Sequence, residues 1–481
     1  MLEDELKYQI KQDFVFCPTK SQQLAIDTMV HFLLSKEQHP VMILRGFAGT
    51  GKTSIASAMV RMLRRIKWNV ELLAPTGRAA KVFSAYSGAK AWTIHRRIYR
   101  RKSINEGGGV FQLGFNNKRN TLFIVDEASM ITTGNDFAES PWGNGNLLDD
   151  LIGFVYQGQG CRLMMIGDKA QLPPVGECES PALSGEVMSC HGLDVFECDL
   201  TDVVRQDSES GILYNANTIR RMIEGLQGRI PRIRLSCFPD IHVVNGDELI
   251  ESLVTSYNKV GIDETIVVTR SNKRANIYNT GIRNSILDRE EILTRGDMLM
   301  VVKNNYHWKV DFLGEGAFIA NGDRVTIQRV RNIRELYGFH FADITLQMPD
   351  YNNEEFKATA ILDSLQSEAP ALTREQEATL YSEVLSDYMY IAGKKERMEK
   401  LKDDVYYNAL QIKYAYATTC HKAQGGQWAH VYVDQGYMTD DMFTADYMHW
   451  LYTAITRATE HLFLVNWNKR QLEEGKRDME D

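Results

Sequence analysis

Hydrophobic runs alternate with amphipathic helical patterns through the first two hundred residues of the chain. Five short apolar runs predict core strands at residues 41–44, 70–74, 121–125, 162–166 and 196–200. Between them, Ala25, Met29 and Phe32 recur at about the 3.6-residue period of a helix, which Thr19 or Ser21 can cap. Strands that alternate with helices are typical of a parallel sheet covered by helices. The pattern therefore predicts an α/β domain.

The second half of the chain repeats this pattern. Apolar runs predict further strands at residues 241–244, 265–269, 431–433 and 462–465. We therefore expect two α/β domains, the first built from residues 1–84 and 119–200 and the second from residues 201–289 and 405–481.

Two stretches interrupt the alternation. Residues 85–118 are basic and then glycine-rich, which favours a hairpin that leaves the first domain. Residues 290–404 begin with short alternating strands near 298–302, 324–330, 344–348 and 356–362, and end in a charged helical stretch at 373–404. They predict a small β module with a helical appendage, inserted into the second domain. Asp350 and Glu355 imitate a nuclease pattern, but their close spacing favours a hairpin turn.

Composition narrows the class of protein. The 481 residues are 44% hydrophobic and 25% charged, as in globular proteins. No run approaches the roughly 18 apolar residues of a membrane helix, and the acidic start lacks the features of a signal peptide, so we expect a cytoplasmic protein with no membrane partner. The seven cysteines form no C-x-x-C pair, which argues against a disulfide framework or a metal cluster. The formal charge of −8 does not by itself indicate a polyanion partner.

One segment has the pattern of a phosphate-binding loop. Residues 46–53 read G-F-A-G-T-G-K-T, follow a predicted strand and open a predicted helix. In this pattern backbone N–H groups face the phosphates, the lysine reaches the β- and γ-phosphates, and the last hydroxyl can hold magnesium. We therefore expect ATP and Mg²⁺ to bind here, with contacts from Gly46, Gly49, Thr50, Gly51, Lys52 and Thr53.

Two adjacent carboxylates complete the predicted ATPase site. Asp126 and Glu127 come directly after the apolar strand at 121–125. A carboxylate at a strand end opposite such a loop can hold magnesium, and its neighbour can orient or deprotonate the attacking water. The predicted reaction is ATP hydrolysis, with Asp126 at the metal and Glu127 at the water.

Seven further segments, in order along the chain, carry a resemblance to a known family. They lie at residues 19–25, 74–80, 93–95, 167–175, 200–206, 417–426 and 452–458, and the most specific is the G-D-K-A-Q-L-P-P-V of residues 167–175. The chain resembles superfamily 1 helicases of the 5′-to-3′ RecD/Dda type, which form branch 1B. The resemblance implies two RecA-like P-loop domains, a pin hairpin in the first and a Src-homology-3-like barrel in the second.

The resemblance also implies roles around the nucleotide. Gln22 would read adenine, Gln171 would sense the γ-phosphate, and Gln424 and Gly425 would lie on the nucleotide side of their segment. Arg205 and Arg457 would be arginine fingers delivered from the second domain, where they stabilise transition-state charge when the cleft closes. Gln427 stands where relatives often have an acidic residue.

Nucleic-acid contacts follow from the same resemblance. It implies DNA contacts at Pro75, Thr76, Arg78, Thr93, His95, Thr419 and His421, and at Asn321 in the barrel. The basic stretch with Arg97, Arg100 and Arg101 leads into a predicted pin, where Phe111 and Phe115 can stack on an exposed base for about 1 to 3 kcal/mol. We expect the cations near Arg78 and in residues 96–102 to line one face, with the acidic surplus elsewhere.

Together these features predict an ATP-dependent DNA helicase. It would translocate 5′ to 3′ on single-stranded DNA and unwind duplexes as a monomer, acting at junctions between single- and double-stranded DNA in replication, repair or recombination, with single-strand-binding or recombination proteins as partners. The sequence leaves open a translocase that displaces proteins without unwinding, a nucleotide-gated DNA-binding subunit of a recombination or nuclease complex, and a P-loop ATPase that acts on no nucleic acid.

Overall fold

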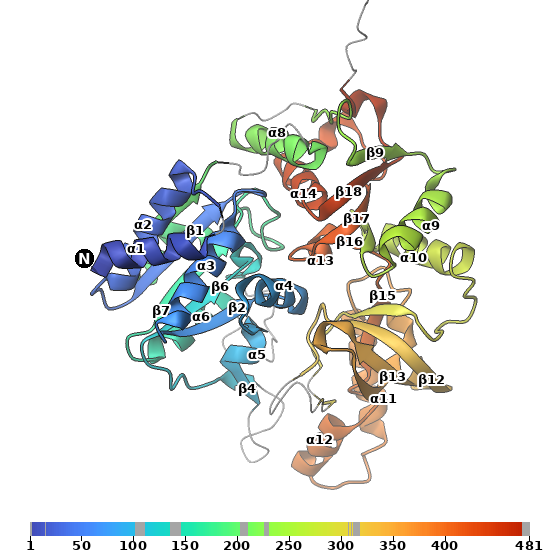
Figure 1. The fold of residues 1–481 in the computed structure, drawn as a ribbon. Coiled ribbons are helices and arrows are strands. Elements are labelled where there is room, and N and C mark those ends of the chain that lie inside the picture. Colours follow the sequence, from blue (N-terminus) through green and yellow to red (C-terminus); the bar gives the residue numbers. More distant parts are fainter. Residues whose placement is uncertain are drawn as a thin grey trace, which may run out of the picture.

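The computed structural model describes residues 2–14, 16–101, 111–134, 146–202, 210–225, 230–305, 307–308, 310 and 318–473, without the side chains of Arg101 and Phe111. Figure 1 shows two α/β lobes that face each other, with a β-barrel beside the second lobe. The two lobes are in contact, because Ala48 of the first donates a hydrogen bond to Tyr452 of the second.

The first domain is a parallel sheet whose strands run in the order β3-β2-β6-β7-β1-β8. The strands are β1 (Pro40–Gly46), β2 (Asn69–Ala74), β3 (Ala91–Thr93), β6 (Thr121–Val125), β7 (Arg162–Gly167) and β8 (Asp194–Leu200). The helices are α1 (Leu2–Asp13), α2 (Lys20–Leu34), α3 (Lys52–Arg65), α4 (Gly77–Ser87), α5 (Ile94–Ile98), α6 (Leu147–Gln157) and α7 (Gly185–Cys190). All five strands predicted in this half are present. Four of them are buried between two hydrophobic clusters, whereas β8 at the edge of the sheet buries one face only.

The hairpin that leaves this domain is shorter than predicted. Strand β3 pairs in parallel with Leu72–Ala74, so residues 91–93 belong to the sheet. Only β4 (Tyr99–Arg101) and β5 (Phe111–Leu113) pair with each other as an antiparallel ribbon. The predicted boundary at residue 85 therefore lies too early, since a three-residue strand gives too weak an apolar pattern to be recognised.

The second domain is a parallel sheet with the order β16-β10-β17-β18-β9. Its strands are β9 (Ile241–Val244), β10 (Thr265–Thr269), β16 (Ala417–Thr419), β17 (Trp428–Asp434) and β18 (Ala458–Val465). The helices are α8 (Gly211–Gly225), α9 (Leu249–Val260), α10 (Asn272–Ser285), α13 (Cys420–Ala423) and α14 (Ala445–Ile455). The four strands predicted here are confirmed, and β16 joins them at one edge.

The inserted β module is a closed barrel. Its strands are β11 (Met298–Val301), β12 (Arg324–Leu336), β13 (Phe339–Met348), β14 (Glu354–Ile361) and β15 (Leu410–Tyr414). The helical appendage consists of α11 (Arg374–Ser386) and α12 (Lys394–Asp403), which precede the closing strand. The predicted boundary at residue 404 stops short of β15, which pairs with both β11 and β14 and so closes the barrel.

The segment that imitates a nuclease motif is a turn. Asp350 lies in a short 3-10 turn between β13 and β14, where Asn352 and Asn353 have positive φ. The Asp350 carboxylate is bound by Lys81 of α4 at 3.0 Å. Within the described part of the chain, no helix is long and apolar enough to cross a membrane.

Candidate nucleotide and nucleic-acid site

The predicted phosphate loop is the turn between β1 and α3. Gly49 and Gly51 have φ of 80° and 83°, a left-handed conformation that other residues rarely adopt. A Cβ added at Gly46 would lie 2.6 Å from Thr50 Oγ1, so only glycine fits there. Lys52 at the start of α3 folds back and donates to the carbonyl oxygens of Gly46 at 2.7 Å and Phe47 at 2.9 Å. The loop thus encloses the lysine at the positive end of a helix dipole, as phosphate binding requires.

Gln22 supports the loop from the side. Its Oε1 accepts from Thr19 N in a capping box that starts α2, at 3.0 Å. Its Nε2 donates to the carbonyl oxygen of Thr50 at 2.9 Å. The side chain is fully buried and both of its polar ends are used inside the protein. Its predicted contact with adenine stays a prediction. In the structure Gln22 holds the backbone of the phosphate loop through Thr50.

Asp126 lies at the end of β6 and is buried close to Lys52 and Thr53. Burial, with the neighbouring Glu127 charge, raises the pKa of Asp126 to about 7, while Lys52 and the hydrogen bond from Thr53 oppose the rise. A hydroxyl and a carboxylate that already contact each other are oxygen ligands of the kind Mg²⁺ prefers. The pair therefore fits a magnesium ion, which would remove the energetic cost of the buried negative charge. Glu127 has a φ of 53°, a left-handed conformation uncommon for a residue with a side chain.

The second domain reaches across to this site through α14. The Tyr452 hydroxyl accepts from Ala48 N in the phosphate loop at 2.8 Å and donates to Asp168 Oδ2 at 2.7 Å. Thr453 Oγ1 accepts from Leu172 N at 2.8 Å. His449 Nδ1 lies 2.9 Å from the carbonyl oxygen of Ala170. Three side chains on one face of α14 therefore hold the loop that follows β7.

Sequence reasoning missed these three residues of α14. Tyr452 and Thr453 open the segment 452–458, in which the family resemblance implies a role for Arg457 alone. His449 lies outside every recognised segment. Its position three and four residues before Tyr452 and Thr453 places all three on one helix face, and this spacing was the available signal.

The predicted nucleotide sensors lie at the same interface. Gln171 is buried in the loop after β7, and Gln424 Nε2 donates to Leu172 O at 2.9 Å and lies 3.4 Å from Gln171 Oε1. Arg457 is buried, and its Nε and Nη1 donate to the carbonyl oxygens of Thr453 and Gly426, both at 3.0 Å. Its guanidinium thus bonds its own domain in this structure. Arg205 lies outside the described residues.

The two segments predicted to grip DNA meet each other across the cleft. Thr76 caps α4 through Ala79 N, and a Cβ added at Gly425 would lie 3.3 Å from Thr76 Oγ1. Arg78 donates to the carbonyl oxygen of Gln427 and lies over the Trp428 ring, 4.3 Å from its centroid. Burial lowers the pKa of Arg78 to about 10. In this conformation Arg78 joins the two domains and is not free for a phosphate.

The remaining predicted DNA residues differ in accessibility. Thr93 is buried and caps α5, whereas Pro75 and Thr419 are half-buried and His421 and Asn321 are exposed. Desolvation lowers the pKa of His95 to about 4, so this ring is neutral at pH 7. Arg97 donates to Glu71 at 2.7 Å.

Two of the side chains that the pin was predicted to present to DNA are exposed among the described residues. Arg100 is exposed, and Phe115 has 75% of its surface accessible. Arg96, by contrast, donates from Nη1 to Tyr351 Oη at 3.0 Å and from Nη2 to Phe318 O at 2.9 Å, both in the barrel module. Arg78, Arg96 and Arg97 thus form contacts within the protein in this structure, and that these cations line one DNA-binding face stays a prediction.

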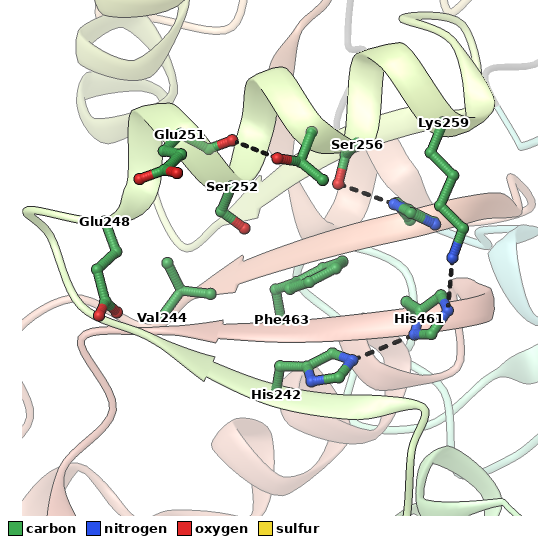
Figure 2. Close-up of a pocket in the computed structure, with 11 residues that line it drawn as sticks. His242, Val244, Glu248, Glu251, Ser252, Ser256, Lys259, His461 and Phe463 are labelled. Carbon is green, nitrogen blue, oxygen red and sulfur yellow. Dashed lines mark hydrogen bonds between the residues drawn. The ribbon is translucent and has the colours of Figure 1, made fainter.

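A separate hollow of about 570 Å³ lies far from the phosphate loop, over the edge of the second sheet (Figure 2). Its floor carries His242, His430 and His461 from three neighbouring strands, and α9 forms its wall. His242 Nε2 lies 3.2 Å from His461 Nδ1, and Lys259 Nζ lies 3.3 Å from His461 Nε2. Desolvation lowers the pKa of all three histidines. The described residues contain no cluster of histidine, cysteine and acidic groups arranged to hold a metal.

Comparisons with known proteins agree with the motifs. Residues 20–225 match the family described as AAA domain, and residues 414–465 match the UvrD-like helicase C-terminal domain. The two matches cover the phosphate loop in one domain, and α14 and the segment 417–426 in the other. They therefore include both sides of the site described above.

Three relatives extend over more than nine-tenths of this chain. The ATP-dependent DNA helicase Dda of Enterobacteria phage T4 is 22% identical, over 93% of this chain and 99% of its own length. The ATP-dependent RecD2 DNA helicase of Deinococcus radiodurans is 23% identical over 93% of this chain, which spans 50% of the RecD2 length. An uncharacterized protein of Acanthamoeba polyphaga mimivirus is 23% identical, over 92% of this chain and 98% of its own length.

A Pif1 helicase from Bacteroides, solved in complex with ADP-AlF3 and single-stranded DNA, aligns over 96% of this chain and 95% of its own with 14% identity and a TM-score of 0.47. The closed five-stranded barrel fits the Src-homology-3-like insertion expected of the RecD/Dda type, and the two parallel sheets fit its two RecA-like domains. The ordered motifs, the two matched families and the relatives agree, and together they support a superfamily 1B helicase, the branch of RecD and Dda.

Proposed function

We propose that this chain is an ATP-dependent DNA helicase that moves 5′ to 3′ on single-stranded DNA and unwinds duplex DNA ahead of it. The observation that carries the proposal is the bridge between the phosphate loop and the second domain, in which Tyr452 contacts both Ala48 and Asp168. A movement of the phosphate loop would therefore displace Tyr452, and with it α14 of the second domain. Such coupling is what converts a hydrolysis cycle into a domain movement.

ATP would bind with its phosphates in the loop between β1 and α3. Lys52 would leave its carbonyl partners for the phosphate oxygens, and the N-terminus of α3 would add its partial positive charge. Thr53 and Asp126 would hold Mg²⁺, which neutralises charge on the phosphates. Glu127 would orient the attacking water, and the nearby Gln171 would contact the γ-phosphate.

Hydrolysis would be completed from the second domain. Arg457 lies two residues beyond the end of α14, and two of its present partners are carbonyl oxygens of its own domain. A small movement of α14 would carry the guanidinium toward the phosphate site, where it would stabilise developing charge. Because Arg457 would reach the phosphates only when the cleft closes, ATP turnover would depend on domain movement.

DNA would run along the surface shared by the first domain, the second domain and the barrel. The exposed His421 and Asn321 offer contacts on the second domain and the barrel. The hairpin β4–β5, with Arg100 and Phe115 beside it, lies on the first domain where a duplex would be split. A junction between single- and double-stranded DNA is therefore the proposed substrate. The proposed location of the protein is the cytoplasm.

The test is unwinding of matched duplexes that carry either a 5′ or a 3′ single-stranded tail, with ATP and Mg²⁺. We expect unwinding of the 5′-tailed duplex alone. Unwinding only of the 3′-tailed duplex would overturn the polarity. DNA-stimulated ATPase without unwinding would favour a translocase that displaces proteins, and tight ATP-dependent DNA binding without turnover would favour a nucleotide-gated binding subunit.

A further inference from the structure

Tyr452 connects the second domain to the phosphate loop of the first. It belongs to α14 of the second domain, yet its hydroxyl lies between two groups of the first domain, Ala48 N and Asp168 Oδ2. Its side chain is 1% exposed and Asp168 is fully buried. A buried contact of this kind across a cleft is a fixed structural connection, since water is excluded from it.

The protonation state of the hydroxyl determines the direction of its hydrogen bonds. Burial and the Asp168 charge raise the pKa of Tyr452 well above its ordinary value, so the phenol keeps its proton. That single proton is donated to Asp168, and an oxygen lone pair accepts from Ala48 N. Tyr452 therefore serves as the acceptor for an N–H group of the phosphate loop.

An incoming phosphate needs the same kind of group. Backbone N–H groups of this loop are the donors that surround the phosphates of a bound nucleotide. Ala48 has one N–H, which cannot give a full hydrogen bond to a phosphate oxygen and to Tyr452 together. Lys52, too, is engaged by carbonyl oxygens of Gly46 and Phe47. Two donors of the loop, the Ala48 N–H and the Lys52 ammonium, are thus already bonded within the protein.

Tyr452 is also tied to the element that carries the predicted arginine finger. Thr453 O accepts from Arg457 Nε at 3.0 Å, and Thr453 Oγ1 accepts from Leu172 N. Loss of the Tyr452 bond to Ala48 would therefore release α14 from the phosphate loop, while Tyr452 through Asp168, Thr453 and His449 keep it against the loop after β7. Release at one point and retention at three others favours a small rotation of α14, not its departure.

Resting on the proposed function, we infer that Tyr452 is a positioning residue that exchanges its bond with Ala48 for a nucleotide phosphate and so links occupancy of the phosphate loop to the placement of Arg457. The hydroxyl holds the nucleotide-free state together. The nucleotide competes with it for the Ala48 N–H, and the freed α14 brings Arg457 toward the phosphates.

The test compares Tyr452→Phe with Tyr447→Phe in the full chain. Tyr447 is the matched control because it is equally buried on the same helix, yet its hydroxyl bonds Gln435 at 2.6 Å and Gln471 at 3.0 Å within the second domain. Equilibrium binding of the β,γ-imido analogue of ATP is measured first. We expect Tyr452→Phe to bind it about three- to tenfold more tightly, the range for one neutral hydrogen bond lost from the free state.

Turnover is measured on the same variants. In Tyr452→Phe the KM for ATP should fall about three- to tenfold while DNA-stimulated kcat stays within about twofold of wild type, because α14 no longer has to be released from Ala48. Tyr447→Phe should change neither quantity by more than about twofold. Unchanged or weaker nucleotide binding by Tyr452→Phe overturns the inference, and so does a loss of kcat of about tenfold or more, which would show that the hydroxyl is needed after the nucleotide has bound. A wild-type chain that binds the analogue but shows no DNA-stimulated turnover removes the proposed function and leaves the binding comparison valid.

A second measurement covers the case in which Tyr452→Phe does not fold. 3-Fluorotyrosine at position 452 keeps the hydroxyl, and its ¹⁹F resonance reports the surroundings of the ring. We expect this resonance to shift when the imido analogue is added, because the hydroxyl loses Ala48 N. A resonance that stays in place while the nucleotide binds overturns the exchange.

Discussion

Arg96 of the first domain donates a hydrogen bond to Tyr351 of the barrel module, with 3.0 Å between Nη1 and the tyrosine oxygen. The same guanidinium donates to Phe318 O, and Lys81 pairs with Asp350 beside it. These contacts join the first domain directly to an insertion of the second. If DNA runs along the surface shared by these domains as proposed, the contacts would help to hold the barrel beside it.

Loss of this connection should shorten the stay of the protein on DNA. Arg96→Ala removes both hydrogen bonds, so the barrel can swing away more easily and the strand escapes. We expect dissociation from single-stranded DNA, measured by stopped-flow fluorescence, to become about three- to tenfold faster. Arg334→Ala is the control, since Arg334 pairs with Asp343 inside the barrel. Equal dissociation rates for wild type and Arg96→Ala would show that the connection does not retain DNA.

Lys52→Ala should separate ATP turnover from DNA binding. The ammonium of Lys52 is the one positive side chain enclosed by the phosphate loop among the described residues, and its removal leaves the phosphate charge uncompensated. We expect ATP hydrolysis to fall by at least about a thousandfold while the affinity for single-stranded DNA without nucleotide changes little. Steady-state ATPase and fluorescence anisotropy measure the two quantities. DNA-stimulated ATPase at the wild-type level would exclude this loop as the catalytic site.

Arg457→Lys should lower kcat and leave folding intact. A lysine keeps the charge but cannot reproduce the planar, multidentate contact of a guanidinium with a phosphoryl group. An arginine finger contributes about 10³ to 10⁵ in kcat, so we expect a loss of at least about a hundredfold for this conservative change. The control is Arg274→Lys, because Arg274 pairs with Asp434 and lies away from the phosphate loop. If the two variants keep equal kcat, Arg457 has a structural role only.

The histidine cluster over the second sheet should make folding stability depend on pH. Folding lowers the pKa of His430 to about 4 from an ordinary value of 6.5, chiefly through desolvation. The unfolded chain therefore binds the proton more readily, so stability is complete above pH 6.5 and declines as the pH falls from 6.5 toward 4. His242 and His461 shift in the same direction.

Urea unfolding at pH 7.5 and pH 5 measures this dependence. The midpoint for the wild-type chain should be lower at pH 5, and His430→Asn should reduce the difference between the two pH values. His340→Asn is the control, because His340 is exposed beside Asp363, outside the cluster. A wild-type midpoint that rises at pH 5 would contradict the neutral state of the cluster.

The local sequence determined the strands, the phosphate loop and the order of the motifs. A buried strand is an uninterrupted apolar run, and the glycines of residues 46–51 permit backbone angles that other residues rarely adopt, so both leave a mark that does not depend on the rest of the chain. The turn at Asp350 was predicted for the same reason, because two alternating strands flank it.

Only the tertiary structure decided which charged and polar groups are free and which join the domains. Arg78 and Arg96 read as DNA-binding cations, but the fold directs them to Gln427 and to Tyr351, far away in the chain. Tyr452 carries no charge and had no role assigned from the sequence, yet the packing of α14 against the first domain brings its hydroxyl to Ala48. A contact between distant segments depends on the placement of whole domains, and no local pattern of residues records it.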